Sequence, residues 1–166
     1  MIVELVDPDV NDRICDPACG TAGFLFTAYR YILKKYTSPD MVTEDEEGGD
    51  WHGLIGDHIT EQNAWDKLHQ DTFYGFDFDS TMVRIALMNM VLHGIKAPPH
   101  IESTDTLSNQ YSGEEAFTVI LANPPFKGGS IDKNDINDRL TLGTTKTELL
   151  FVEKCTGCSK SEVSAA

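Results

Sequence analysis

Short, continuous apolar runs recur along the chain, and stretches with helical spacing follow them. A strand buried on both faces of a parallel sheet is apolar throughout, so the runs predict strands. The predicted strands lie at residues 13–15, 72–77 and 117–123, and the more polar segment 100–103 is a further predicted strand. Apolar residues that recur every three to four positions predict helices, at residues 22–36, 81–94 and 147–155. Because strands and helices alternate, the pattern favours an α/β fold with a doubly wound, mainly parallel sheet.

The spacing within the helices also predicts which side chains face the core. In the first helix the apolar face consists of Phe24, Leu25, Ala28, Ile32 and Leu33. In the second helix the predicted inward-facing residues are Met82, Ile85, Ala86 and Leu92, with Asn89 as a polar interruption. We interpret its methionines, Met82, Met88 and Met90, as core packing. Ser80 is expected to cap the start of this helix, and Gly94 to end it.

Two polar segments interrupt this pattern. Residues 37–71 predict an insertion or long loop with one helix around residues 61–69, and their acidic run at 44–47 is interpreted as solvated surface. Residues 127–146 are rich in Gly, Asp, Asn and Thr and predict a mobile loop that becomes ordered around a substrate.

Composition and cysteine content narrow the class of protein. A chain of 166 residues with 40% hydrophobic and 24% charged residues suits one globular domain. No apolar run approaches the roughly 20 residues of a membrane span, and no signal peptide is visible. The four cysteines therefore indicate a reduced, cytoplasmic setting. Cys155 and Cys158 have the spacing of half a zinc site, but no second ligand pair lies nearby, so no metal site is predicted.

The formal net charge of −14 bears on possible partners. Nucleic-acid affinity comes largely from Lys and Arg side chains that displace counterions from phosphates. A surface this acidic repels a phosphate backbone. If DNA is the substrate, another component has to supply most of the binding.

The run "DPACGTAGF", from Asp16 to Phe24, lies between the first strand and the first helix. Gly20 and Gly23 permit a tight turn and the close approach of a ligand to the backbone. The spacing is not that of a dinucleotide-binding loop, and the Asp16 carboxylate would sit badly beside a pyrophosphate. This carboxylate fits better beside a cationic ligand, such as an amino-acid ammonium or a sulfonium. The alternative is a structural turn, which explains the glycines but not the whole run.

Acidic residues also follow the next two strands. Asp77 is positioned to accept hydrogen bonds from both hydroxyls of a ribose. Asp79 either contacts a ligand or caps the following helix. Phe78 either covers an adenine ring or fills the core, and Asp105 could accept a hydrogen bond from an adenine amino group.

The last strand ends in "NPPF", from Asn123 to Phe126. The side-chain oxygen of Asn123 and the carbonyl oxygen of Pro124 are both acceptors. By accepting from the two N–H bonds of an exocyclic amine, they would hold its lone pair toward an electrophile. Phe126, beyond Pro125, would stack on the ring of a flipped base. The alternative is a strand-ending turn with a packed aromatic ring.

The runs "DPACGTAGFL", "FYGFDFDSTMVRIALMNMVLHGI", "ILANPPF" and "KTELLFVEKC", in this order, resemble the modification (M) subunits of type I restriction-modification systems. These are S-adenosylmethionine-dependent adenine-N6 DNA methyltransferases with a Rossmann-like fold. The resemblance implies that the cofactor-binding residues are Asp16, Ala18, Gly20, Thr21, Gly23, Phe24, Asp77, Phe78 and Asp105. It implies that Asn123, Pro124, Pro125 and Phe126 hold the target adenine during direct methyl transfer. No covalent intermediate is needed, so Cys19 is not expected to be a nucleophile.

The resemblance also implies partners. In such systems a separate specificity subunit recognises the DNA, which accounts for the acidic charge, and a restriction subunit completes the assembly. Two other functions remain alternatives. One is methylation of glutamine side chains in proteins or of guanine in RNA, where similar sites occur. The other is an inactive remnant that only binds the cofactor.

Residues 1–155 are therefore expected to form part of a methyltransferase domain, a truncated version of the Rossmann-like sheet. The opening "IVELVDPDV" resembles the middle of a protein, and the upstream motif and later strands of the family are missing. Residues 156–166 lose the helical pattern. Codons for them exist that read "YRLLKVGGQRG" when shifted by one base, so we hypothesise that this tail is a frameshift product.

Overall fold

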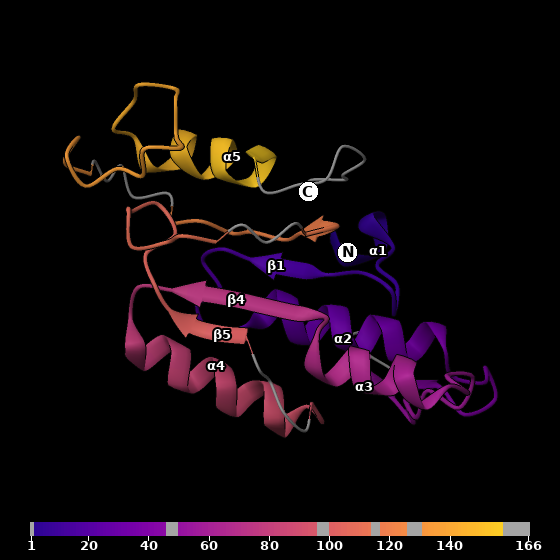
Figure 1. Cartoon of the computed structure of the whole chain (residues 1–166). Helices are drawn as coiled ribbons and strands as arrows, with labels where there is room; N and C mark the ends of the chain where they lie inside the picture. The colour runs from indigo at the N-terminus through magenta and orange to yellow at the C-terminus, as the bar shows by residue number, and fades with distance from the viewer. Residues whose placement is uncertain (1, 46–49, 96–99, 114–116, 126–130, 158–166) are drawn as a thin grey trace.

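The computed structural model describes residues 2–45, 50–95, 100–113, 117–125 and 131–157. The helices and strands are, in chain order, α1 (Ile2–Val6), β1 (Ile14–Asp16), α2 (Gly23–Lys35), β2 (Thr43–Glu44), β3 (Trp51–His52), α3 (Gln62–Gln70), β4 (Phe73–Asp77), α4 (Ser80–Leu92), β5 (His100–Ser103), β6 (Val119–Ile120) and α5 (Thr147–Gly157) (Figure 1). Phe126, Cys158, residues 127–130 and most of the 156–166 tail lie outside the described residues.

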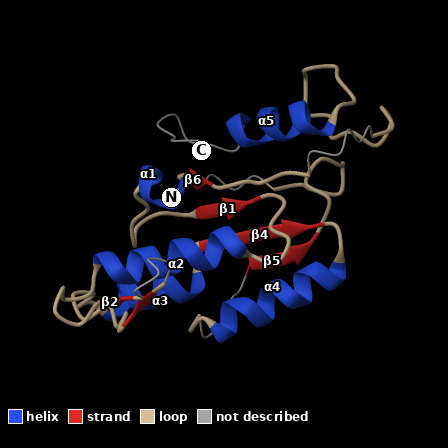
Figure 2. Cartoon of the chain, turned by 180° about the vertical axis from the view of Figure 1, so that it is seen from behind, coloured by secondary structure: helices blue, strands red, loops and turns tan. Residues whose placement is uncertain are grey.

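The main sheet has four strands in the order β5-β4-β1-β6, and every neighbouring pair is parallel. Figures 1 and 2 show α2 and α4 on one side of this sheet and α5 on the other. The predicted doubly wound, mainly parallel sheet is therefore confirmed. Because all four strands run in the same direction, the loops that follow them meet at one edge.

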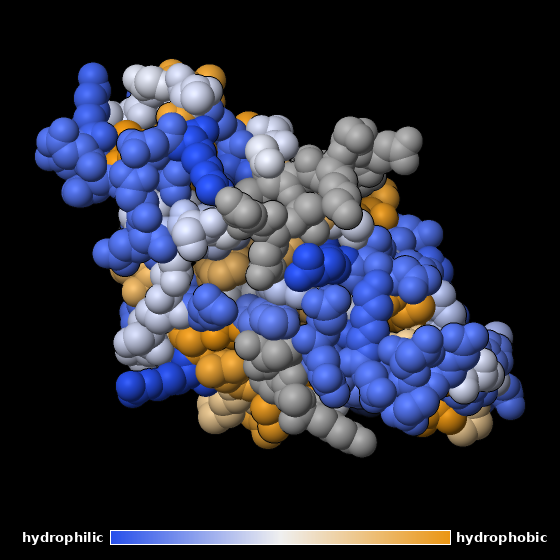
Figure 3. Space-filling model, in the orientation of Figure 1, coloured by the Kyte–Doolittle hydropathy of each residue, from blue (hydrophilic) through white to orange (hydrophobic). Residues whose placement is uncertain are grey.

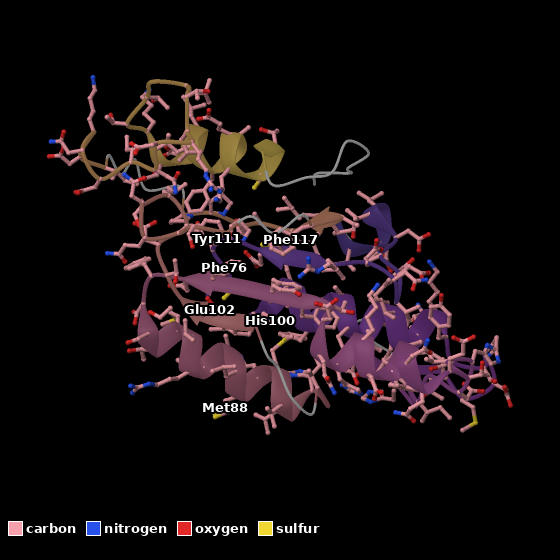
Figure 4. The ribbon with its side chains drawn as sticks, viewed as in Figure 1. Phe76, Met88, His100, Glu102, Tyr111 and Phe117 are labelled. Carbon is pink, nitrogen blue, oxygen red and sulfur yellow. The ribbon has the colours of Figure 1, made fainter. Side chains whose placement is uncertain are left out.

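Side chains that alternate along β4 separate the core into two layers. Phe73 packs on the side of α2 and α4, in a cluster with Leu25, Ile32 and Met90. Tyr74 and Phe76 point to the opposite side, where they join Phe117, Tyr111 and Ile120. The ring centroids of Phe76 and Tyr111 lie 5.1 Å apart in an edge-on contact, visible in Figure 4. Cys155 of α5 packs against this second layer, so α5 covers the sheet face that α2 and α4 leave open.

The orientation of α4 differs from the prediction. The buried side chains are Val83, Ala86 and Met90, whereas Met88 is 56% exposed and Leu92 is 73% exposed. Apolar residues occur on several sides of this helix, so their spacing alone did not identify the inward face. The outward residues form apolar surface along α4 (Figure 3).

The predicted cap of α4 is also wrong. Asp79 Oδ1 accepts a hydrogen bond from the backbone N–H of Thr81 at 2.7 Å, so Asp79 is the N-cap in place of Ser80. The capping role considered for Asp79 is confirmed. Gly94 follows the helix with φ of 99°, a left-handed conformation that glycine adopts without strain, and ends the helix as expected.

The last strand is shorter than predicted, because only Val119 and Ile120 form β6. The hydrogen bonding nevertheless continues one residue further, since the N–H of Leu121 donates to the carbonyl of Cys15 at 2.9 Å. The chain then turns away at the two prolines, which cannot donate to a ladder.

The two polar segments have defined contacts where they are described. Residues 37–71 contain the antiparallel pair β2–β3 and the expected helix, α3. In the 131–146 part of the second segment, Asn137 is 4% exposed and its Nδ2 donates to the carbonyls of Ser108 and Tyr111. Mobility of the rest stays a prediction. Helix α1, which the sequence pattern did not predict, buries Val3. Within the described ranges, no helix is long and apolar enough to cross a membrane.

Gly75 in β4 is expected to tolerate no side chain. A Cβ atom there would lie 2.8 Å from Ile101 Cδ1, 3.0 Å from Leu25 Cδ1 and 3.1 Å from Cys19 Sγ. Gly75→Ala should therefore destabilise the chain by about 1–3 kcal/mol through overpacking. Urea unfolding measures this, with Gly157→Ala as the control, because no atom lies within 4 Å of a Cβ at that position. Equal unfolding midpoints for the two variants would contradict the packing argument.

Candidate functional site

A cavity lies where the loops after the parallel strands meet. The chain passes from β1 to β4 on one side and later places β6 on the other side of β1. Open α/β sheets bind ligands at such a reversal of strand order. The cavity has a volume of about 530 Å³. Its lining consists of Pro17, Ala18, Asp77, Phe78, Asp79, Met82, Thr104, Asp105, Thr106, Leu107, Asn123, Pro125, Ile131, Thr147 and Phe151.

Six predicted site residues line this cavity together. They come from the ends of four strands and are Ala18, Asp77, Phe78, Asp105, Asn123 and Pro125. The cavity lining does not include the other predicted residues that the structure describes, namely Asp16, Gly20, Thr21, Gly23, Phe24 and Pro124. The cofactor- and base-binding roles of all these residues stay predictions.

Asp77 connects two of the loops around the cavity. Its Oδ2 accepts from the backbone N–H of Gly20 at 3.0 Å, and its Oδ1 accepts from that of Asp79 at 2.9 Å. A carboxylate has about four acceptor positions, so capacity remains for the hydroxyls of a ligand. Asp77 therefore holds the loop after β1 in place in addition to its predicted contact with a ribose.

The loop after β1, residues 17–22, has an unusual backbone. The N–H of Cys19 donates to the carbonyl of Phe76 at 2.9 Å, which holds the loop on β4. Gly20 has φ of 52° and Ala22 has φ of 64°, so both residues are in the left-handed region. A Cβ at Gly20 or Gly23 would meet no atom within 4 Å, which leaves room for a ligand above the backbone. We call residues 17–22 the β1 loop.

Two buried ionisable groups lie in and next to the β1 loop, Cys19 within it and Asp16 at the end of β1. Asp16 is 2% exposed, and its Oδ1 accepts from the N–H of Ala18 at 3.1 Å. Burial, with a further contribution from the nearby Asp77 charge, raises the pKa of Asp16 to about 7. Burial and the charges of Asp16 and Asp77 raise the pKa of Cys19 to about 12. Cys19 therefore remains a thiol at neutral pH and lacks the thiolate that a nucleophile needs.

The loops after β4 and β5 form the other walls. Phe78 is 78% exposed and lines the cavity, so the alternative that it fills the core is wrong. Asp105 Oδ1 accepts from the N–H of Leu107 at 2.9 Å. The buried hydroxyl of Thr106 donates to the carbonyl of Pro17 at 3.0 Å and joins the β5 loop to the β1 loop.

Sequence analysis missed the apolar walls of the cavity. Met82 was assigned to the core, but it lines the cavity with Leu107, Ile131 and Phe151. Leu107, Phe151 and the neighbouring Leu150 form a separate apolar cluster. Phe151 lies within the apolar pattern of the last predicted helix, but nothing in that pattern separates a cavity wall from a core residue.

The family model for N-6 DNA methylases matches residues 1–160. The chain belongs to this family. The methylase subunit of the type I restriction enzyme EcoEI from Escherichia coli is 31% identical over 153 residues. That match covers 92% of the chain and 26% of the subunit, so the chain spans about a quarter of this relative's length.

Solved structures from type I restriction-modification systems have the same fold as this chain. The crystal structure of the type I restriction enzyme EcoKI M protein matches with a TM-score of 0.76 and 24% identity, over 98% of this chain and 30% of that protein. A chain from a structural study of complex assembly and conformational transition in a type I restriction-modification system matches with a TM-score of 0.73 and 28% identity. This second match covers 97% of this chain and 28% of the other.

Proposed function

We propose that this N-6 DNA methylase chain provides the cofactor-binding part of a cytoplasmic adenine-N6 DNA methyltransferase. In this proposal it transfers a methyl group from S-adenosylmethionine as part of the modification subunit of a type I restriction-modification system. The observation that carries the proposal is the shared cavity. It is lined by four predicted cofactor residues, Ala18, Asp77, Phe78 and Asp105, and by Asn123 and Pro125 of the predicted base-binding motif.

The cavity suits the parts of S-adenosylmethionine. Its volume of about 530 Å³ lies within the usual range of small-molecule sites, roughly 300–1,000 Å³. Asp77 provides acceptors for the ribose hydroxyls, and Phe78 and Asp105 offer a ring face and an acceptor for adenine. The buried Asp16 provides negative charge near the loop that would hold the cationic methionine end. The chemistry of the residues present thus fits this cofactor.

The target amine would enter from the side of β6. The Asn123 side-chain oxygen and the Pro124 carbonyl would accept from the two N–H bonds of adenine N6, and this orients the nitrogen lone pair toward the methyl group. S-adenosylmethionine supplies the electrophilic methyl group when it is bound. The chain's own contribution is orientation of the two reactants, which can lower a barrier by several kcal/mol, up to roughly 7–11.

The proposed partners follow from the relatives and the charge. Relatives that include the EcoEI protein are methylase subunits of type I restriction enzymes, and one matching chain comes from a study of complex assembly. With a net charge of −14, this chain needs other parts of such a complex to hold DNA. We propose that the specificity subunit supplies that binding and that a restriction subunit joins the same assembly.

Calorimetric titration with S-adenosylmethionine tests the proposal. We expect saturable binding, and we expect Asp77→Ala to weaken it by roughly 10- to 100-fold, because charged hydrogen bonds contribute about 1.5–3 kcal/mol. Asp66→Ala is the charge-matched control: Asp66 lies on α3, accepts a hydrogen bond from Gln62 and does not line the cavity, so this variant should bind as the wild type does. Absence of binding by folded wild-type chain would refute the proposed cofactor site.

A further inference from the structure

Asn89 is a polar residue in the middle of an otherwise mainly apolar helix, α4. It is half-buried, and its Nδ2 donates a hydrogen bond to the backbone carbonyl of Thr21 at 3.0 Å. Thr21 belongs to the β1 loop, 68 positions earlier in the chain. Figure 2 shows α4 beside α2, on the same side of the sheet. The bond therefore connects the β1 loop to α4, the helix that follows β4.

The carbonyl that Asn89 holds lies between two left-handed residues. Gly20 adopts φ of 52° without strain, but Ala22, with φ of 64°, carries a Cβ and is fully buried. A left-handed conformation costs a non-glycine residue roughly 1–2 kcal/mol. Such a conformation persists where surrounding contacts determine it, and these places cluster at functional sites.

The β1 loop is restrained on both sides of Thr21 by groups from the β4–α4 unit. Asp77 accepts from the N–H of Gly20, and Asn89 donates to the carbonyl of Thr21. Ala22 is the N-cap of α2 but provides no side-chain hydrogen bond to the first turn. Within the loop, the N–H of Ala22 donates to the carbonyl of Cys19 at 2.7 Å, and Asn89 restrains the carbonyl of the same Thr21–Ala22 peptide from outside the loop.

We propose that Asn89 is a positioning residue for the proposed cofactor site: it fixes the Thr21 carbonyl and so keeps the β1 loop in the shape that receives the amino-acid end of the cofactor. This inference rests on the proposed function. Asn89 does not line the cavity, and the predicted ribose and adenine contacts come from Asp77, Phe78 and Asp105. Loss of the Asn89 bond should therefore affect only ligands that carry the amino-acid end.

Two ligands separate positioning from general stability. S-adenosylhomocysteine carries the amino-acid end, whereas 5′-methylthioadenosine keeps the adenosine and the sulfur but lacks that end. Asn89→Leu should weaken binding of S-adenosylhomocysteine about threefold to tenfold, the usual worth of one hydrogen bond, and change that of 5′-methylthioadenosine less than twofold. Asn89→Asp should weaken S-adenosylhomocysteine binding further, because it turns an oxygen toward the Thr21 carbonyl.

Calorimetry on the purified chain and its variants provides the measurement, with thermal unfolding of each variant as a check on folding. Arg84→Leu, an exposed change on the same helix, is the control and should bind both ligands as the wild type does. An equal loss for both ligands in Asn89→Leu and Asn89→Asp, or no loss for either, overturns the positioning role. If the wild type binds both ligands, such a result leaves the proposed function intact. Failure of the wild type to bind either ligand overturns the proposed function and this inference with it.

Discussion

Asp16→Asn is expected to stabilise the ligand-free chain above pH 7 and to weaken binding of S-adenosylmethionine by about 100-fold. The carboxyl group is 2% exposed, and burial together with the Asp77 charge raises its pKa to about 7. At pH 8 the folded chain therefore contains a buried, ionised carboxylate without a bound cation. An asparagine has the same shape and can still accept from the N–H of Ala18, but it carries no charge.

The effect of pH on stability follows from the direction of this pKa shift. The pKa of Asp16 rises from 3.8 in the unfolded chain to about 7 in the folded chain. Between these values the folded chain binds more protons than the unfolded chain, so stability falls as pH rises through this window. Each pKa unit corresponds to about 1.4 kcal/mol, which makes the expected loss a few kcal/mol by pH 8. Asp16→Asn should remove this contribution to the pH dependence.

Urea unfolding at pH 5 and pH 8 checks the stability half of this prediction. We expect the wild type to lose stability relative to Asp16→Asn between the two pH values. Calorimetry at pH 8 checks the binding half, because the cofactor carries positive charge that the ionised Asp16 attracts. Cofactor binding should also release a proton near pH 7, since a nearby cation lowers the pKa of Asp16. If the difference in unfolding free energy between the wild type and Asp16→Asn is the same at pH 5 and at pH 8, the argument is wrong.

The positions of the acidic site residues were predictable because strand direction determines them. Asp16, Asp77 and Asp105 each lie at or just after the end of a predicted strand, and parallel strands bring such positions to one edge of a sheet. Because β4 and β6 lie on opposite sides of β1, Asp77 and Asn123 follow strands on opposite sides of β1. These relations need only the alternation of strands and helices, which the sequence pattern shows clearly.

The contacts that depend on packing between elements were not predictable in the same way. Met88 and Leu92 continue the apolar character of α4 but point outward, and Met82 faces the cavity. Leu107 and Phe151 meet at the cavity although 44 positions separate them in the chain, because α5 lies across the loop after β5. The bond from Asn89 to Thr21 is of the same kind: the sequence showed a polar interruption, and only the fold showed its partner.

Asn123→Ala is expected to reduce methyl transfer by about 100- to 1,000-fold and to leave cofactor affinity within twofold of the wild type. Asn123 is exposed at the end of β6 and lines the cavity opposite the predicted ribose contact. Its oxygen would accept from the amine only while the base is in place, so its loss should affect the chemical step more than cofactor binding. Losses of this size are found when one hydrogen-bonding group that stabilises a transition state is removed.

The matched variant is Asn123→Asp, which keeps an oxygen acceptor at the same position. It should retain more methyl transfer than Asn123→Ala, because the amine still finds a partner for one of its N–H bonds. Transfer of a tritiated methyl group to adenine-containing DNA, with the specificity subunit present, measures both rates against the wild type. Equal rates for Asn123→Ala and the wild type would show that this side chain does not orient the amine. Equal losses in the alanine and aspartate variants would instead assign the effect to the amide N–H₂, and the target amine would then have to be held by another acceptor of the chain.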